Sequence, residues 1–127
     1  MYELYPLGRT PLLMACKWGS QKTVASLLRH NAKIWGDEIG PAARRGDLGI
    51  VKELVEHGAD VNRGTIYNPP PIVSAVLLEY KEMFYFLLER GALLTGDFTK
   101  AMVQKAKEQG LESMLVLLEE HGVDTKD

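Results

Sequence analysis

The sequence is most informative at first through what it lacks. Its single cysteine, Cys16, excludes a disulfide within the chain. Neither an Asn-x-Ser nor an Asn-x-Thr glycosylation signal is present. The first residues lack the charged start and apolar core of a secretory signal, and no apolar run approaches the roughly 18 residues that a membrane-spanning helix needs. We therefore expect an intracellular protein, cytoplasmic or nuclear, that has no part in a membrane.

An excess of charge of either sign is also missing. The chain has 15 Lys and Arg residues against 17 Asp and Glu residues, a net charge of −2, and a pI near 5.9. Domains that bind nucleic acid are normally basic, so we expect no nucleic-acid partner. With 46% hydrophobic and 25% charged residues, the 127-residue chain has the composition of one folded domain rather than a disordered segment.

Motifs for catalysis and for metal binding are missing as well. The glycines form neither a Gly-x-Gly-x-x-Gly loop nor a Gly-Lys-Ser/Thr ending, and the histidines and Cys16 lack the spacing of a zinc site. The sequence shows no combination of a nucleophile, a base and an orienting group that would indicate a catalytic site. We therefore expect no enzyme, no catalytic residue, no metal and no cofactor, and we interpret Cys16 as a small buried residue of the core.

What the sequence does contain is a repeated helical unit. Residues 51–62 read VKELVEHGADVN, in which Val51, Leu54 and Val55 share one face of a helix. Gly58 then supplies the left-handed backbone that ends a helix. Similar units are VASLLRHNA (24–32), FYFLLERGA (84–92) and LVLLEEHGV (115–123). Their closing positions, 31, 58, 91 and 122, are 27, 33 and 31 residues apart, a period typical of stacked repeats.

A second helical segment precedes each unit. In the first copy it reads TPLLMACKWG, where Thr10 is a predicted N-cap, Pro11 takes the first helical position and Gly19 ends the helix. Ser20 is the predicted N-cap of the second helix of this copy. These segments resemble the ankyrin-repeat family. Its Gly-x-Thr-Pro-Leu-His-x-Ala-Ala motif is matched by residues 8–16, and its Val-x-x-Leu-Leu-x-x-Gly-Ala-Asp-Val-Asn motif by residues 51–62.

The resemblance implies an all-α fold, an ankyrin-type helix-turn-helix solenoid of about four repeats with short or irregular hairpins. We expect one domain over residues 1–127, with repeats at approximately 8–35, 36–62, 63–94 and 95–123. Two positions depart from the family pattern. The second repeat is six residues short, which reduces its projecting hairpin, and Glu79 replaces the glycine between the two helices, which predicts a turn of different shape there.

Several polar residues have simple structural interpretations. His30, His57 and His121 each precede a helix-closing residue, where a polar side chain suits the negative end of the helix dipole. Asp37 and Glu38 stand at an expected helix start, where we interpret them as a cap and a match to the positive end of the dipole.

The resemblance further implies a protein–protein interaction scaffold that binds a partner protein through its concave face. In the family, binding residues lie at hairpin tips and at the exposed ends of the inner helices. Transferred to this sequence, they are Arg9, Lys17, Trp18, Arg44, Arg45, Tyr67 and Leu77. The same stripe extends to Leu78, Glu108 and Gln109. A tryptophan beside two arginines is typical of an interaction hot spot, and arginine suits a carboxylate or phosphate on the partner.

Some alternatives remain open at this point. Leu77 and Leu78 would belong to the core if the turn at Glu79 rotates them inward, and Trp35 suits packing as well as contact. The alternative function is a homodimer that covers the outer side of the first repeat. Its groove would bind a small molecule, or carry a minor enzymatic activity, near Trp18, Asp37, Glu38 and Tyr67.

Overall fold

The structure, a computed structural model, describes residues 10–65 and 68–126. All regular secondary structure in these two ranges is helical. The helices are α1 (Pro11–Trp18), α2 (Gln21–Arg29), α3 (Ile39–Arg44), α4 (Leu48–Glu56), α5 (Pro71–Leu77), α6 (Lys81–Glu89), α7 (Asp97–Glu108) and α8 (Glu112–Glu120). Within the described residues, no helix combines the length and the apolar character that crossing a membrane requires.

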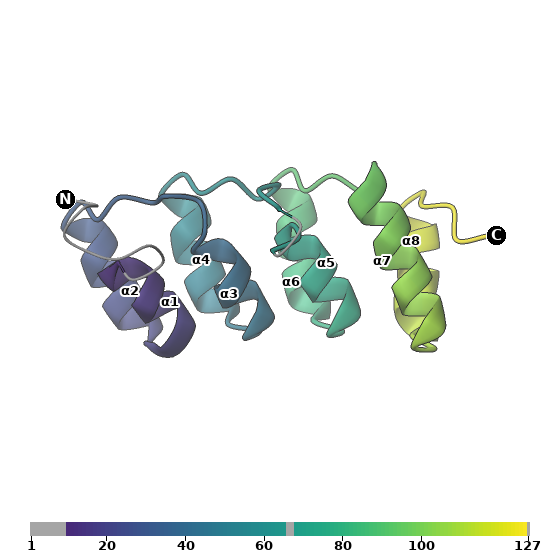
Figure 1. The fold of residues 1–127 in the computed structure, drawn as a ribbon, viewed down its shortest axis with the longest axis horizontal. Helices are drawn as coiled ribbons and strands as arrows, with labels where there is room; N and C mark the ends of the chain where they lie inside the picture. The colour runs from purple at the N-terminus through teal and green to yellow at the C-terminus, as the bar shows by residue number, and fades with distance from the viewer. Residues whose placement is uncertain (1–9, 66–67, 127) are drawn as a thin grey trace.

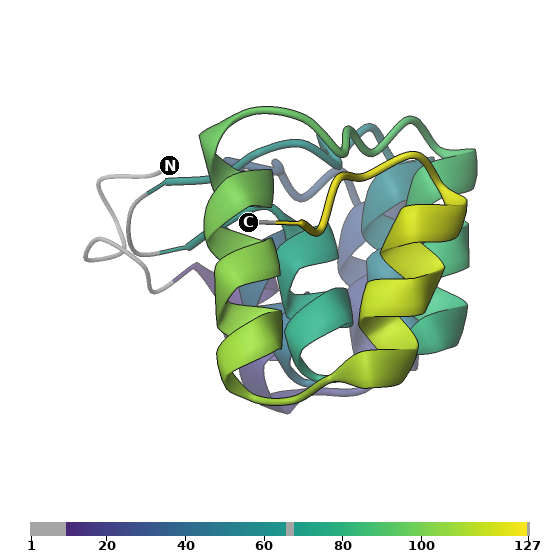
Figure 2. The ribbon, with the colours of Figure 1, turned by 90° about the vertical axis from the view of Figure 1, so that its right-hand side faces the viewer.

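The helices stand in two layers. Each odd-numbered helix lies against the even-numbered helix that follows it, and the pairs form a row (Figure 1). The inner layer consists of α1, α3, α5 and α7, which contact one another in that order. Seen along the row, the outer layer of α2, α4, α6 and α8 lies on the opposite side (Figure 2). This arrangement confirms the predicted all-α helix-turn-helix solenoid of about four repeats.

The core lies between the two layers and follows the repeated pattern. Leu54 of α4, Leu87 of α6 and Leu118 of α8 occupy the same position of the unit, and none of them is exposed. Leu27, at the equivalent position of the first copy, is only partly buried and packs against the edge of the cluster. Because buried residues from all four pairs belong to one cluster, neighbouring pairs stabilise each other.

The predicted helix ends are confirmed. The Oγ1 atom of Thr10 accepts a hydrogen bond from the Leu13 N–H at 3.2 Å, and the hydroxyl of Ser20 accepts one from the Thr23 N–H at 3.2 Å. At the other ends, the closing positions adopt positive φ values: 66° at Asn31, 97° at Gly58, 92° at Gly91 and 85° at Gly122.

The three histidines are structural, as predicted. The Nδ1 atom of each lies within hydrogen-bond distance of the carbonyl oxygen four residues earlier: 2.7 Å for His30, 2.9 Å for His57 and 2.9 Å for His121. Each histidine therefore provides a partner for a carbonyl in the last turn of an outer helix.

The turn between α5 and α6 corrects a prediction. Glu79 does not give this turn a different shape, because it adopts φ of 62°, close to 73° at Gly46 and 69° at Gly110 in the equivalent turns. The turn that differs from the other three joins α1 and α2, where Gly19 has an extended backbone with φ of −90° and ψ of −168°. The turns at Gly46 and Gly110 share this left-handed backbone, and Glu79 adopts it at a cost of about 1–2 kcal/mol because it carries a Cβ atom.

Glu79→Gly is therefore expected to raise the free energy of unfolding by about 1 kcal/mol, since glycine reaches a positive φ without a steric clash. Urea unfolding followed by circular dichroism measures this change. The matched control is Glu82→Gly in the first turn of α6, which is expected to lower stability by about 0.5–1 kcal/mol. If Glu79→Gly also lowered stability, the backbone at this turn would not be strained.

Candidate functional site

A shallow groove of about 360 Å³ lies where the C-terminal ends of α1 and α3 meet. It brings together four of the predicted binding residues. We call it the Trp18 groove, and its lining residues are Lys17, Trp18, Pro41, Arg44 and Arg45.

Trp18 provides the exposed apolar surface of this groove. The residues that α1 buries include Leu12, Ala15 and Cys16, whereas Trp18, the last residue of the helix, is 70% exposed. The Nζ atom of Lys17 lies 5.5 Å from the centroid of the indole ring, in a cation–π contact. A large aromatic side chain so exposed is a feature of binding surfaces rather than of stable cores.

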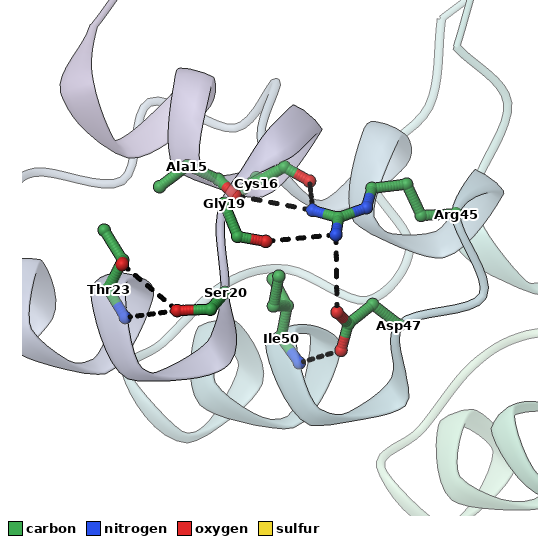
Figure 3. Close-up of polar contacts among 8 residues, drawn as sticks. All are labelled: Ala15, Cys16, Gly19, Ser20, Thr23, Arg45, Asp47 and Ile50. Carbon is green, nitrogen blue, oxygen red and sulfur yellow. Dashed lines mark hydrogen bonds and ion pairs between the residues drawn. The ribbon is translucent and has the colours of Figure 1, made fainter.

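Arg45 has a structural role that the sequence did not reveal (Figure 3). Its Nη1 atom donates to the carbonyl oxygen of Cys16 at 3.0 Å, and its Nη2 atom donates to the carbonyl oxygen of Gly19 at 3.0 Å. The same guanidinium lies 3.7 Å from a carboxylate oxygen of Asp47. Arg45 therefore satisfies carbonyl groups at the C-terminal end of α1 and links the first two repeats.

Arg44 leaves more of its charge available to a partner. It is exposed, and its Nη1 atom donates to the Oδ1 atom of Asn68 at 2.6 Å, which is a neutral acceptor. The hydroxyl of Tyr80 donates to the backbone carbonyl of Arg44 at 3.3 Å and holds the end of α3 in place. Among residues 10–65 and 68–126, Arg44 forms no ion pair, so its guanidinium remains available for a carboxylate.

Leu77 lies in a second groove, of about 610 Å³, between α5 and α7. Leu77 is half-buried and packs against the core, while Leu78 is 48% exposed. Phe98, which is 41% exposed, was not among the predicted binding residues, although an aromatic residue in an otherwise polar helix could have indicated it. We call this the Phe98 groove, and its lining residues are Pro69, Val73, Leu77, Asp97, Phe98, Ala101, Met102 and Lys105.

The remaining predicted positions lie elsewhere. Arg9 and Tyr67 lie outside the described residues. Glu108 and Gln109 are exposed at the end of α7, in neither groove. Trp35 is 39% exposed, with the Nζ atom of Lys33 at 4.0 Å from its ring centroid.

Asp37 and Glu38, which the alternative function places near Trp18, do not line the Trp18 groove. Glu38 is fully buried rather than facing a groove, and Asp37 lines a separate cavity of about 50 Å³. From the sequence, Asp37 and Glu38 are interpreted together as a cap and a dipole match. Glu38 does take the N-cap position of α3, but its carboxyl group makes no hydrogen bond to that helix and turns back. Its Oε2 and Oε1 atoms accept hydrogen bonds from the N–H groups of Trp35 at 2.9 Å and Gly36 at 2.8 Å.

The chemistry of Cys16 agrees with its predicted place in the core. Its side chain is fully buried, and burial, reinforced by the negative charge of Glu38, raises the pKa of the thiol to about 12. A thiol with this pKa stays protonated near neutral pH and is a poor nucleophile. In the part of the chain that the structure describes, no group of three His, Cys, Asp or Glu side chains is placed to hold a metal ion.

Comparisons with known proteins agree with this architecture. The family described as "Ankyrin repeat" matches residues 7–35 and 42–66. The ankyrin repeat domain of human ASB11 superposes with a TM-score of 0.77 over 91% of this chain and 56% of that one, at 22% sequence identity.

Similar sequences come from several kingdoms. "Potassium channel AKT1" of Arabidopsis thaliana is 34% identical over 97 residues, which are 72% of this chain and 11% of that protein. "Putative ankyrin repeat protein YahD" of Escherichia coli (strain K12) is 33% identical over 91 residues, 65% of this chain and 45% of that protein. "Ankyrin repeat protein nuc-2" of Neurospora crassa is 35% identical over 117 residues, 84% of this chain and 11% of that protein. The chain thus spans less than half the length of these relatives. The chain belongs to the ankyrin-repeat family.

Proposed function

We propose that this chain is a protein-binding module that docks a partner protein on its concave face, with the Trp18 groove at the centre of the contact and no catalysis of its own. The proposal rests chiefly on one observation: Trp18 is 70% exposed in a groove that it shares with Lys17 and Arg44. The proposed setting is the cytoplasm or the nucleus, where a chain without disulfides is ordinary.

The geometry suits recognition of a protein by a preformed surface. Trp18 and Arg44 lie at the ends of two helices, α1 and α3, which the hydrogen bonds of Arg45 hold together. Binding therefore costs little conformational entropy of this surface. Tryptophan and arginine are the residues that most often dominate the binding energy of an interface. A stable complex would bury about 1,200–2,000 Å² in total, so loops beside the groove would also take part.

Trp18→Ala and Arg44→Glu are each expected to weaken partner binding by about tenfold or more while the helical content stays unchanged, because both side chains are exposed hot-spot types. The partner is first recovered by affinity capture on the full chain and identified. Its affinity for each purified variant is then measured by calorimetry, and folding is checked by circular dichroism.

The matched control is Val116→Ala, at a 54% exposed position of α8 in the outer layer, which is expected to leave the affinity unchanged. Arg45 is unsuitable for this test because its substitution would break the bonds to backbone carbonyls that join α1 and α3, whereas Arg44→Glu gives up one exposed side-chain hydrogen bond, to Asn68. Unchanged affinity in folded Trp18→Ala and Arg44→Glu would contradict the proposed face.

A further inference from the structure

We propose that the segment recognised by this surface is acidic and extended, and that it carries two apolar anchor residues about six positions apart. One anchor would occupy the Trp18 groove and the other the Phe98 groove. This inference rests on the proposed function, since it specifies the partner of the same face.

The first argument is charge. The chain has a net charge of −2, yet the two grooves are lined by four basic residues and one acidic residue, Asp97. Arg45 is balanced by Asp47 at 3.7 Å. Within residues 10–65 and 68–126, Lys17, Arg44 and Lys105 form no ion pair. Three cations that form no ion pair among the described residues, against one acidic side chain in the grooves, attract carboxylates of a partner and repel a basic segment.

The second argument is apolar surface. Each groove presents one exposed aromatic ring, Trp18 at 70% and Phe98 at 41% exposure. The Phe98 groove is also lined by apolar atoms of Val73, Leu77 and Met102. An aliphatic side chain placed against such a surface is stabilised because apolar area is removed from water. Each groove therefore suits one apolar residue of the partner.

The third argument is continuity between the grooves. Arg44 lines the Trp18 groove and donates to Asn68 at 2.6 Å, and the next residue, Pro69, lines the Phe98 groove. The two depressions are therefore separated by α3 and α5, which contact each other, rather than by a distant part of the chain. A single bound segment can reach both.

The spacing of the anchors follows from helix packing. The first groove lies between α1 and α3 and the second between α5 and α7, so their centres are two helix-to-helix steps apart, or about 16–20 Å. An extended chain advances about 3.3 Å per residue, so about five to six residues cover this distance, and we take about six. An even number also places both anchors on the same side of the extended segment. A short acidic segment does not form a stable helix alone, which favours the extended form.

Binding of fluorescein-labelled synthetic peptides to the full chain, measured by fluorescence anisotropy, tests the inference. The probe is a short peptide of Glu and Ser with two leucines about six positions apart. One control peptide has the same composition with adjacent leucines, and a second has Lys in place of Glu. We expect the probe to bind about tenfold more tightly than either control. We also expect Trp18→Ala, Phe98→Ala and Lys105→Glu each to weaken its binding, and Val116→Ala to leave it unchanged.

Each of the other outcomes contradicts one part of this inference. Equal binding of the Lys peptide overturns the charge preference, and equal binding of the adjacent-leucine peptide overturns the two-anchor geometry. Tighter binding of a single-stranded oligonucleotide overturns the choice of a protein segment. If the probe does not bind at about 1 mM while Trp18→Ala still weakens the captured partner, the inference fails and the proposed function stands. If Trp18→Ala changes neither the binding of the probe nor the binding of the captured partner, both the inference and the proposed function fail.

Discussion

Leu54→Ala is expected to lower the free energy of unfolding by about 2–5 kcal/mol, the usual effect of removing a leucine side chain from a packed core. Leu54 is fully buried in α4, and its backbone carbonyl accepts the hydrogen bond from the Ala59 N–H at 2.9 Å that closes the helix. The cavity would therefore form at the helix end that leads to the next repeat. Domains of this size are stabilised by about 5–15 kcal/mol in total, so the loss is a large share of the whole.

Urea unfolding followed by circular dichroism measures the effect, and Leu93→Ala is the matched control. Leu93 is 61% exposed, so the same change of side chain there is expected to alter stability by less than about 0.5 kcal/mol. Because each pair of helices packs on its neighbours, we expect Leu54→Ala to unfold the array in one transition at lower urea. Similar stabilities for Leu54→Ala and Leu93→Ala would contradict the described core.

Glu38→Ala is expected to lower the free energy of unfolding by about 2–4 kcal/mol, because it removes both acceptors of two backbone N–H groups. The carboxyl group of Glu38 is fully buried and accepts hydrogen bonds from Trp35 at 2.9 Å and Gly36 at 2.8 Å. The carboxyl group makes no side-chain hydrogen bond to α3, so the substitution acts on the connection that precedes the helix. The substitution would thus loosen the shortened connection between the first two repeats.

Two neighbouring variants make this prediction specific. Asp37→Ala removes an exposed carboxylate beside it and is expected to change stability by less than about 0.5 kcal/mol. Glu38→Gln keeps one oxygen acceptor but sets an amide donor against an N–H group, so an intermediate loss is expected. Chemical unfolding measures all three, and amide hydrogen exchange at Trp35 and Gly36 reports the local effect. Equal losses for Glu38→Ala and Asp37→Ala would contradict the role of the buried carboxyl group.

Much of the fold followed from local patterns in the sequence. The caps at Thr10 and Ser20 and the left-handed positions at Asn31 and Gly58 were predicted because each depends on a few consecutive residues. Glu79 was mispredicted because its residue type suggested another turn, while the connection between α5 and α6 has the same left-handed backbone as the turns at Gly46 and Gly110.

The candidate site was predictable only in part. Lys17, Trp18 and Arg44 could be selected because a repeat places equivalent positions on one face, and the structure brings them into one groove. The structural role of Arg45 could not be predicted, since the carbonyl groups that it binds lie 26 to 30 positions earlier in the chain.

By itself, the sequence determined the helical repeats, their ends and the stacked architecture, because hydrophobic period, capping and glycine conformation act over a few residues. Only the tertiary structure decided which charges remain free and where apolar surface is left open. Arg45 lies beside the carboxylate of Asp47, while Arg44 forms no ion pair among the described residues, and Phe98 and Leu77 line one groove between α5 and α7. Such relations depend on the distances between helices, which no local pattern of residues encodes.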